Sequence, residues 1–213
     1  MQPIVRVKIC GLTNEADARQ AVDAGADALG FNTWKTGQRF IDLQRHRAWI
    51  QALPPFVTKV ALLVNASLAE AAEIARLPYI DALQLHGDET AEYCRAAAEF
   101  GRPLIKALRA RTVEDLDGLD TFGTHHFLID AHVKGLFGGT GAQADLALAQ
   151  EFTRRYPHFS LILAGGLRPE TVGEAIRTVR PSAVDVSSGV ESAPGVKDPE
   201  KLRGFIRTVR ELA

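Results

Sequence analysis

The chain has 213 residues, of which 46% are hydrophobic and 24% charged, and its net charge is −1. These values predict one globular domain over residues 1–213 and exclude a disordered chain. The sequence has no basic stripe, no apolar run of about 18 residues and no recognisable secretory signal, so we expect neither a nucleic-acid partner nor a membrane span.

Short apolar runs alternate with amphipathic stretches from one end of the chain to the other. The runs are rich in leucine and β-branched residues with little polar alternation, which is typical of parallel strands covered by helices. Eight strands are predicted: 5–10, 28–32, 58–64, 82–85, 104–108, 126–130, 161–164 and 183–187.

The segments between the runs carry helical patterns. Apolar residues recur at i, i+3, i+4 and i+7 in 68–75, 172–179 and 202–209. Eight strand–helix units fill the chain and no linker divides it. This predicts an α/β fold, a closed (βα)8 barrel with short loops, and a doubly wound open sheet is the alternative.

Active sites of such barrels form at the carboxyl ends of the strands. Polar residues at these ends are therefore the candidates for chemistry. They are Cys10, Asn32, His86, Asp130, Asp185, Ser187 and Ser188.

Cys10 and Asp130 end the first and sixth predicted strands. A thiol and a carboxyl group at one rim suggest an acid–base pair. A helix beginning near Asn14 would favour the thiolate of Cys10 through its dipole. Alternatively, Cys10 is a small buried hydrophobic residue, the common fate of a free cysteine.

Two glycine-rich turns follow the seventh and eighth strands, Gly165-Gly166 and Ser188-Gly189. Main-chain N–H groups at these two positions commonly hold a phosphate in such barrels. Tight turns without a ligand are the alternative. A third turn, Gly138–Gly141 with Gly139, is open to three interpretations: a further phosphate contact, part of a cover over the substrate, or a plain loop.

Three other residues have weaker signals. Strand alternation places Lys8 beside Cys10 and facing Asp185, since the first and eighth strands are neighbours in a closed barrel; we therefore expect a Lys8–Asp185 ion pair. His86 either lines the pocket or is structural. Arg39, in the loop after the second strand, either binds a carboxylate or is solvated.

The two cysteines, Cys10 and Cys94, form neither a disulfide framework nor a zinc motif. We therefore expect a cytoplasmic protein without a metal site. The sequence does not distinguish a monomer from a homodimer.

Several motifs together resemble the phosphoribosylanthranilate isomerase family of tryptophan biosynthesis, over nearly the full length. The first and last are the most specific. The motifs are Lys8–Thr13, Gln84–Glu89, Leu128–Asp130, Gly138–Gly141, Leu163–Leu167, Val184–Glu191 and Pro194–Pro199.

The resemblance implies a (βα)8 barrel that catalyses a cofactor-free Amadori rearrangement, the third step from chorismate to tryptophan. N-(5-phosphoribosyl)anthranilate becomes 1-(2-carboxyphenylamino)-1-deoxyribulose 5-phosphate. By motif position, Asp130 is the general acid, Cys10 the general base and Arg39 the ligand of the anthranilate carboxylate. The turns around Gly166 and Ser188-Gly189 would hold the phosphate.

Two segments depart from the family pattern. Gly37-Gln38 precede Arg39 where the family commonly has Ser-Pro, and they follow an unusual Asn32-Thr33-Trp34. Ala144-Asp145-Leu146 stands where the family often has Phe-Asp-Trp.

Two other enzymes with phosphate-binding barrels and a non-catalytic barrel are the alternatives to this function. An epimerase would need histidine and carboxylate metal ligands at several strand ends, and these are missing. An indole-glycerol-phosphate synthase would need a lysine at a strand end, whereas Lys106 lies within the fifth strand. A non-catalytic sugar-phosphate-binding barrel would have no reason to keep both Cys10 and Asp130.

Overall fold

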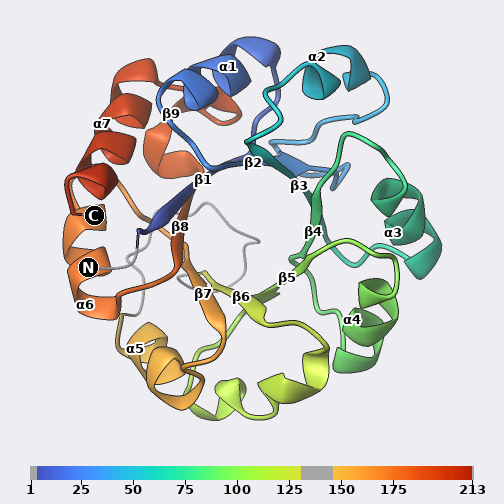
Figure 1. The fold of residues 1–213 in the computed structure, drawn as a ribbon, viewed down its shortest axis with the longest axis vertical. Coiled ribbons are helices and arrows are strands. Elements are labelled where there is room, and N and C mark those ends of the chain that lie inside the picture. Colours follow the sequence, from blue (N-terminus) through green and yellow to red (C-terminus); the bar gives the residue numbers. More distant parts are fainter. Residues whose placement is uncertain (1–3, 131–145, 213) are drawn as a thin grey trace.

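The computed structural model describes residues 4–130 and 146–212. Eight parallel strands close into a barrel in chain order, with β1 paired to β8 (Figure 1). This confirms the predicted fold, and every predicted strand boundary lies within one residue of the observed one. The strands are β1 (Arg6–Cys10), β2 (Ala28–Asn32), β3 (Thr58–Leu63), β4 (Ala82–Leu85), β5 (Leu104–Leu108), β6 (His126–Ile129), β7 (Ser160–Leu163) and β8 (Ala183–Val186).

Helices surround the barrel as an outer ring (Figure 1). The predicted apolar stripes of α6 and α7 pack inward with all of their residues buried. In the stripe of 68–75 Ala71 and Ala75 are buried, whereas Leu68 is exposed. The helices are α1 (Glu15–Asp23), α2 (Arg47–Gln51), α3 (Leu68–Ala75), α4 (Ala91–Ala98), α5 (Leu146–Arg155), α6 (Val172–Val179) and α7 (Pro199–Arg210).

Two regions differ from a simple repeat of strand and helix. After β5 the chain forms the short 3-10 helices η1 (Glu114–Leu116) and η2 (Leu119–Phe122). Gly118 and Gly123 bound η2 with φ of 72° and 69°, a left-handed conformation that stops a longer helix. After β8 the chain forms η3 (Ser188–Val190) and a hairpin of β9 (Glu191–Ala193) and β10 (Val196–Lys197) before α7.

The interior of the barrel has an apolar side and a charged side. Ala107, Leu128 and Ile162 form a small apolar cluster on β5–β7. On β1 and β8, Lys8 Nζ donates to Asp185 Oδ1 at 2.7 Å, and both side chains are buried. This confirms the ion pair predicted from alternation and closure.

Gly30 makes room for this charged side. It pairs with Cys10 across β1 and β2. A Cβ at Gly30 would lie 2.8 Å from Cys10 Sγ and 3.0 Å from Lys8 Nζ. A glycine is therefore needed for the thiol and the ammonium to lie beside this strand.

Candidate active site

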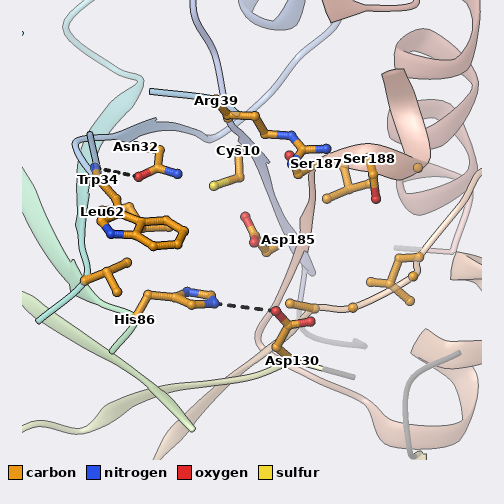
Figure 2. A pocket seen from close by; sticks show the side chains of 18 residues that line it. Cys10, Asn32, Trp34, Arg39, Leu62, His86, Asp130, Asp185, Ser187 and Ser188 are labelled. Atoms are coloured by element: carbon orange, nitrogen blue, oxygen red, sulfur yellow. Dashed lines mark hydrogen bonds and ion pairs between the residues drawn. The ribbon is translucent and has the colours of Figure 1, made fainter. Parts of the chain in front are cut away.

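A cavity opens at the carboxyl ends of the strands (Figure 2). Together with the solvent at its mouth it has a volume of about 700 Å³. Gly139 and the Gly138–Gly141 turn lie outside the described residues. The other predicted site residues all line the cavity: Cys10, Arg39, His86, Asp130, Gly165, Gly166, Asp185, Ser188 and Gly189.

Cys10 ends β1 in a buried position with charges around it. Burial raises the pKa of the Cys10 thiol above its ordinary value; Lys8 and Lys197 oppose this rise, and Asp185 adds to it. The prediction of a thiolate favoured by the helix dipole was therefore wrong. Helix α1 begins five residues later, at Glu15, so the removal of the thiol from water outweighs the effect of the helix dipole.

We expect iodoacetamide to alkylate Cys10 at a rate that rises with pH and reaches its midpoint above pH 9.0, the ordinary value. The thiolate is the reacting form, and burial disfavours it. Mass spectrometry of the digested protein separates this peptide from that of Cys94, whose pKa burial raises to about 11. A midpoint below pH 9.0 would mean that the two lysines outweigh burial.

Asp130, directly after β6, faces a chain of polar side chains from β4. His86 Nε2 lies 3.5 Å from Asp130 Oδ2, and Gln84 Nε2 lies 2.9 Å from His86 Nδ1. When the Gln84 amide donates to Nδ1, the ring proton of neutral His86 lies on Nε2, toward Asp130. Sequence reasoning missed Gln84, although it shares a strand face with His86.

The two glycine turns meet at one side of the cavity. Gly165 and Gly166 have φ of 85° and 61°, which only glycine adopts readily. A Cβ at Gly189 would overlap the carbonyl oxygen of Leu167, so the two turns pack directly together. Within the described part of the chain, the main-chain N–H groups of Gly165, Gly166, Ser188 and Gly189 have no hydrogen-bond acceptor.

Arg39 reaches the cavity despite the unusual loop before it. The loop closes on Asn32, whose carbonyl accepts from Ile41 N at 2.8 Å and whose side chain accepts from Trp34 N at 2.8 Å. Arg39 then packs over Gly11, where a Cβ would overlap its side chain. Its guanidinium donates to Glu191 through Nε at 2.8 Å and Nη2 at 2.6 Å.

The opposite wall of the cavity is apolar and was not predicted. Trp34, Leu62 and Val64 contribute to it, and Figure 2 shows the Trp34 indole next to Leu62. Alternation along β3 could have identified Leu62 as an inward-facing residue. Trp34 lies in a loop, where the sequence has no comparable signal.

Comparisons with known proteins agree with these features. A family model described as N-(5'-phosphoribosyl)anthranilate (PRA) isomerase matches residues 7–208. The N-(5'-phosphoribosyl)anthranilate isomerase of Pseudomonas putida is 46% identical over 209 residues, 97% of this chain and 98% of the relative. The crystal structure of phosphoribosyl anthranilate isomerase from Thermotoga maritima is 39% identical and superposes with a TM-score of 0.88, covering 98% of this chain and 100% of that one.

A second solved structure holds a ligand. It is a phosphoribosyl anthranilate isomerase in complex with reduced 1-(o-carboxyphenylamino)-1-deoxyribulose 5-phosphate. It is 38% identical with a TM-score of 0.85, and the match covers 98% of this chain and 100% of that one. The chain therefore belongs to the N-(5'-phosphoribosyl)anthranilate isomerase family.

Proposed function

We propose that this cavity converts N-(5-phosphoribosyl)anthranilate to 1-(2-carboxyphenylamino)-1-deoxyribulose 5-phosphate by acid–base catalysis, with Asp130 as the acid and Cys10 as the base. As a member of the family, the chain is an aldose–ketose isomerase of tryptophan biosynthesis. The observation that carries the mechanism is that Cys10 and Asp130, on strands distant in sequence, line one cavity together with both glycine turns.

The first step opens the ribose ring. Asp130 gives its proton to the ring oxygen, the bond from this oxygen to C1 breaks, and the lone pair of the anilino nitrogen forms an iminium with C1. His86, 3.5 Å from Asp130 Oδ2, holds the carboxyl group toward the cavity. General acids in such positions typically contribute about 10²–10⁴ in rate.

The second step removes the C2 proton. The cationic iminium acidifies C2, and Cys10 Sγ accepts this proton while the C–H electrons form the C1–C2 double bond. The resulting enol then tautomerises to the aminoketone, so the overall reaction is an isomerisation. Lys8 and Lys197 counter the burial of the thiol, and the positive charge of the iminium further favours the thiolate when it is needed.

The remaining groups match the two anionic ends of the substrate. We assign the phosphate to the N–H groups of the turns at Gly165-Gly166 and Ser188-Gly189. The anthranilate carboxylate is assigned to Arg39, since a guanidinium binds a carboxylate through two parallel hydrogen bonds. The apolar wall of Trp34 and Leu62 suits the benzene ring.

The alternative enzyme with a catalytic lysine is disfavoured by the position of Lys106. Its Nζ donates to the Gly87 carbonyl at 2.8 Å and to Glu89 Oε2 at 2.7 Å. Its neighbour Ala107 faces the barrel interior, so alternation turns Lys106 toward α4. It does not line the cavity.

Turnover by the purified protein tests the proposal. We expect the fluorescence of N-(5-phosphoribosyl)anthranilate to decrease with enzyme, at the same rate with and without a chelator. Binding of the reduced product without turnover would instead identify a non-catalytic sugar-phosphate-binding barrel.

The location and assembly of the chain stay predictions. None of the helices in the described ranges is long and apolar enough to cross a bilayer. We propose a cytoplasmic enzyme, as its two unpaired cysteines suggest.

The Thermotoga maritima relative is described as dimeric, and light scattering would distinguish a monomer from a homodimer here.

A further inference from the structure

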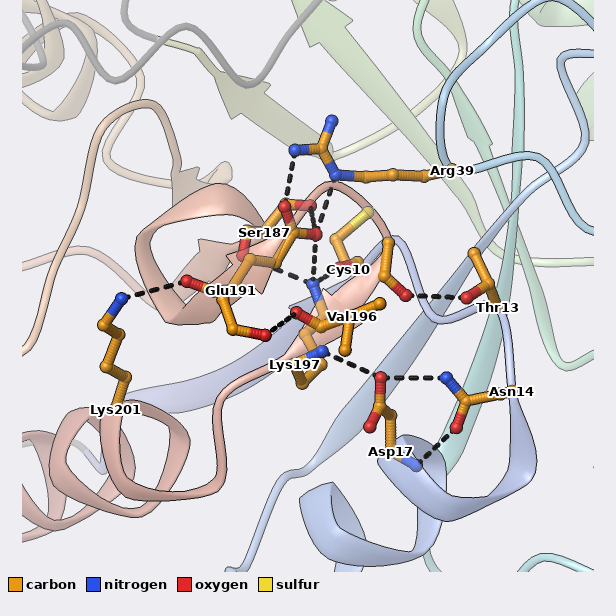
Figure 3. A network of polar contacts seen from close by, with 12 residues as sticks. Cys10, Thr13, Asn14, Asp17, Arg39, Ser187, Glu191, Val196, Lys197 and Lys201 are labelled. Carbon is orange, nitrogen blue, oxygen red and sulfur yellow. Dashed lines mark hydrogen bonds and ion pairs between the residues drawn. The ribbon is translucent and has the colours of Figure 1, made fainter.

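Two buried charged residues next to the cavity form an ion pair that the mechanism above does not explain. Glu191 begins β9 and Lys197 ends β10, in the hairpin that follows β8 (Figure 3). Their side chains are 4% and 0% exposed, and Lys197 Nζ lies 2.9 Å from Glu191 Oε1. Burying such a pair costs desolvation energy, so its contacts are the place to look for a role.

Lys197 joins the ends of β1 and β8. Its Nζ also donates to the Cys10 carbonyl at 2.6 Å and to the Ser187 carbonyl at 3.2 Å. Three acceptors surround the nitrogen, and only the charged ammonium has three hydrogens to satisfy them. Burial lowers the pKa of Lys197 below its ordinary 10.5, and Glu191 opposes that shift.

Glu191 occupies one edge of the Arg39 guanidinium. The Nε and Nη2 atoms donate to its two carboxylate oxygens. Both hydrogens of Nη1 and the second hydrogen of Nη2 are therefore not used by Glu191. Figure 3 shows Nη1 pointing away from Glu191. The free edge carries two parallel donors, the arrangement that binds a carboxylate.

The net charge of Arg39, Glu191 and Lys197 also favours the binding of an anion. Although burial opposes ionisation of Glu191, the contacts with Arg39 and Lys197 hold its pKa below the ordinary value. Arg39 and Glu191 alone would be neutral together and would attract an anion weakly. With Lys197 the group carries one net positive charge, next to a cavity whose proposed substrate carries two anionic groups.

We infer that Glu191 and Lys197 are positioning residues for carboxylate recognition. Glu191 fixes which edge of Arg39 faces the cavity, and Lys197 cancels the charge of Glu191 so that Arg39 still attracts the substrate. The inference rests on the proposed function, because it needs Arg39 to bind the anthranilate carboxylate. A purely structural pair would instead serve only to hold the hairpin.

The test compares two ligands by calorimetry with the full chain. One is reduced 1-(o-carboxyphenylamino)-1-deoxyribulose 5-phosphate, and the other is the same compound without the carboxylate. The quantity measured is the ratio of the two affinities. Loss of structure in the site weakens both ligands and leaves the ratio unchanged, whereas a defect in carboxylate recognition lowers it.

In Lys197→Met we expect the ratio to fall about tenfold or more, as for the loss of a charged hydrogen-bonding partner. In Lys197→Met/Glu191→Gln the net positive charge returns but the edge of Arg39 is no longer fixed. We therefore expect the affinity ratio of the double variant to be higher than that of Lys197→Met. It should still be about threefold or more below the ratio of the wild type. Lys201→Met is the matched control, because Lys201 donates to the main-chain carbonyl of Glu191 and not to its carboxylate; its ratio should not change.

An unchanged ratio in Lys197→Met would overturn the role of Lys197, and a full wild-type ratio in the double variant would overturn that of Glu191. If Lys197→Met does not fold, the double variant, which has no buried pair to break, still decides: a ratio below that of the wild type supports the inference and an equal ratio refutes it. Wild-type protein that does not turn over substrate refutes the proposed function instead. Wild-type protein that binds both ligands equally refutes carboxylate recognition altogether.

Discussion

Replacing Cys10 by alanine lowers kcat by about 10²–10⁴-fold, and Asp130→Asn has an effect of the same size. Each substitution removes the group that transfers one of the two protons, and both replacements are no larger than the original side chain. Steady-state turnover of N-(5-phosphoribosyl)anthranilate by fluorescence measures the loss. The affinity for the reduced product should stay close to that of the wild type, because Arg39 and the glycine turns are unchanged.

The other cysteine supplies the control for this experiment. Cys94 is buried in α4 and does not line the cavity, so Cys94→Ala should retain wild-type kcat. Near-full activity in Cys10→Ala or in Asp130→Asn would eliminate the corresponding proton transfer. Loss of turnover together with loss of product affinity would point to a damaged cavity rather than to chemistry.

The barrel and the rim of the site were predictable because strands leave a direct pattern in the sequence. A strand buried on both sides is a short apolar run, and the residue after it lies at the rim of the barrel. Alternation and closure together were also enough to place Lys8 against Asp185. These predictions need only the strand boundaries and the period of two.

The features that the sequence did not reveal depend on the conformation of loops or on how deeply a side chain is buried. Trp34 and the Glu191–Lys197 pair are placed by segments with no regular period, although Glu191 and Lys197 both lie in motifs of the family. The start of α1 was visible in the sequence, but the burial of Cys10 was not, and burial decides the direction of its pKa shift. After β5, the eight predicted strand–helix units imply a helix, whereas the chain forms the 3-10 helices η1 and η2, the second of them bounded by Gly118 and Gly123.

The second large effect concerns stability. We expect Lys8→Met to destabilise the protein by about 3–5 kcal/mol, because it leaves Asp185 as an unpaired buried charge. For a chain of this size, that lowers Tm by about 6–20 °C. The same change removes a charge that lowers the pKa of Cys10, so the midpoint of Cys10 alkylation should move to higher pH.

Two further variants separate the charge from the packing. Lys8→Met/Asp185→Leu removes both charges and should recover most of the lost stability, since apolar replacements of a buried pair are often tolerated. Lys59→Met breaks a similar pair, at 3.0 Å from Asp81, whose side chain is 40% exposed; water can solvate that carboxylate, so the loss should be about 1 kcal/mol or less. Equal losses in Lys8→Met and the double variant would mean that the unpaired charge of Asp185 is not the cause of the loss. Recovery in the double variant would instead show that the two charges add no net stability to the barrel. A shift in the midpoint of Cys10 alkylation would then show that Lys8 acts on the thiol.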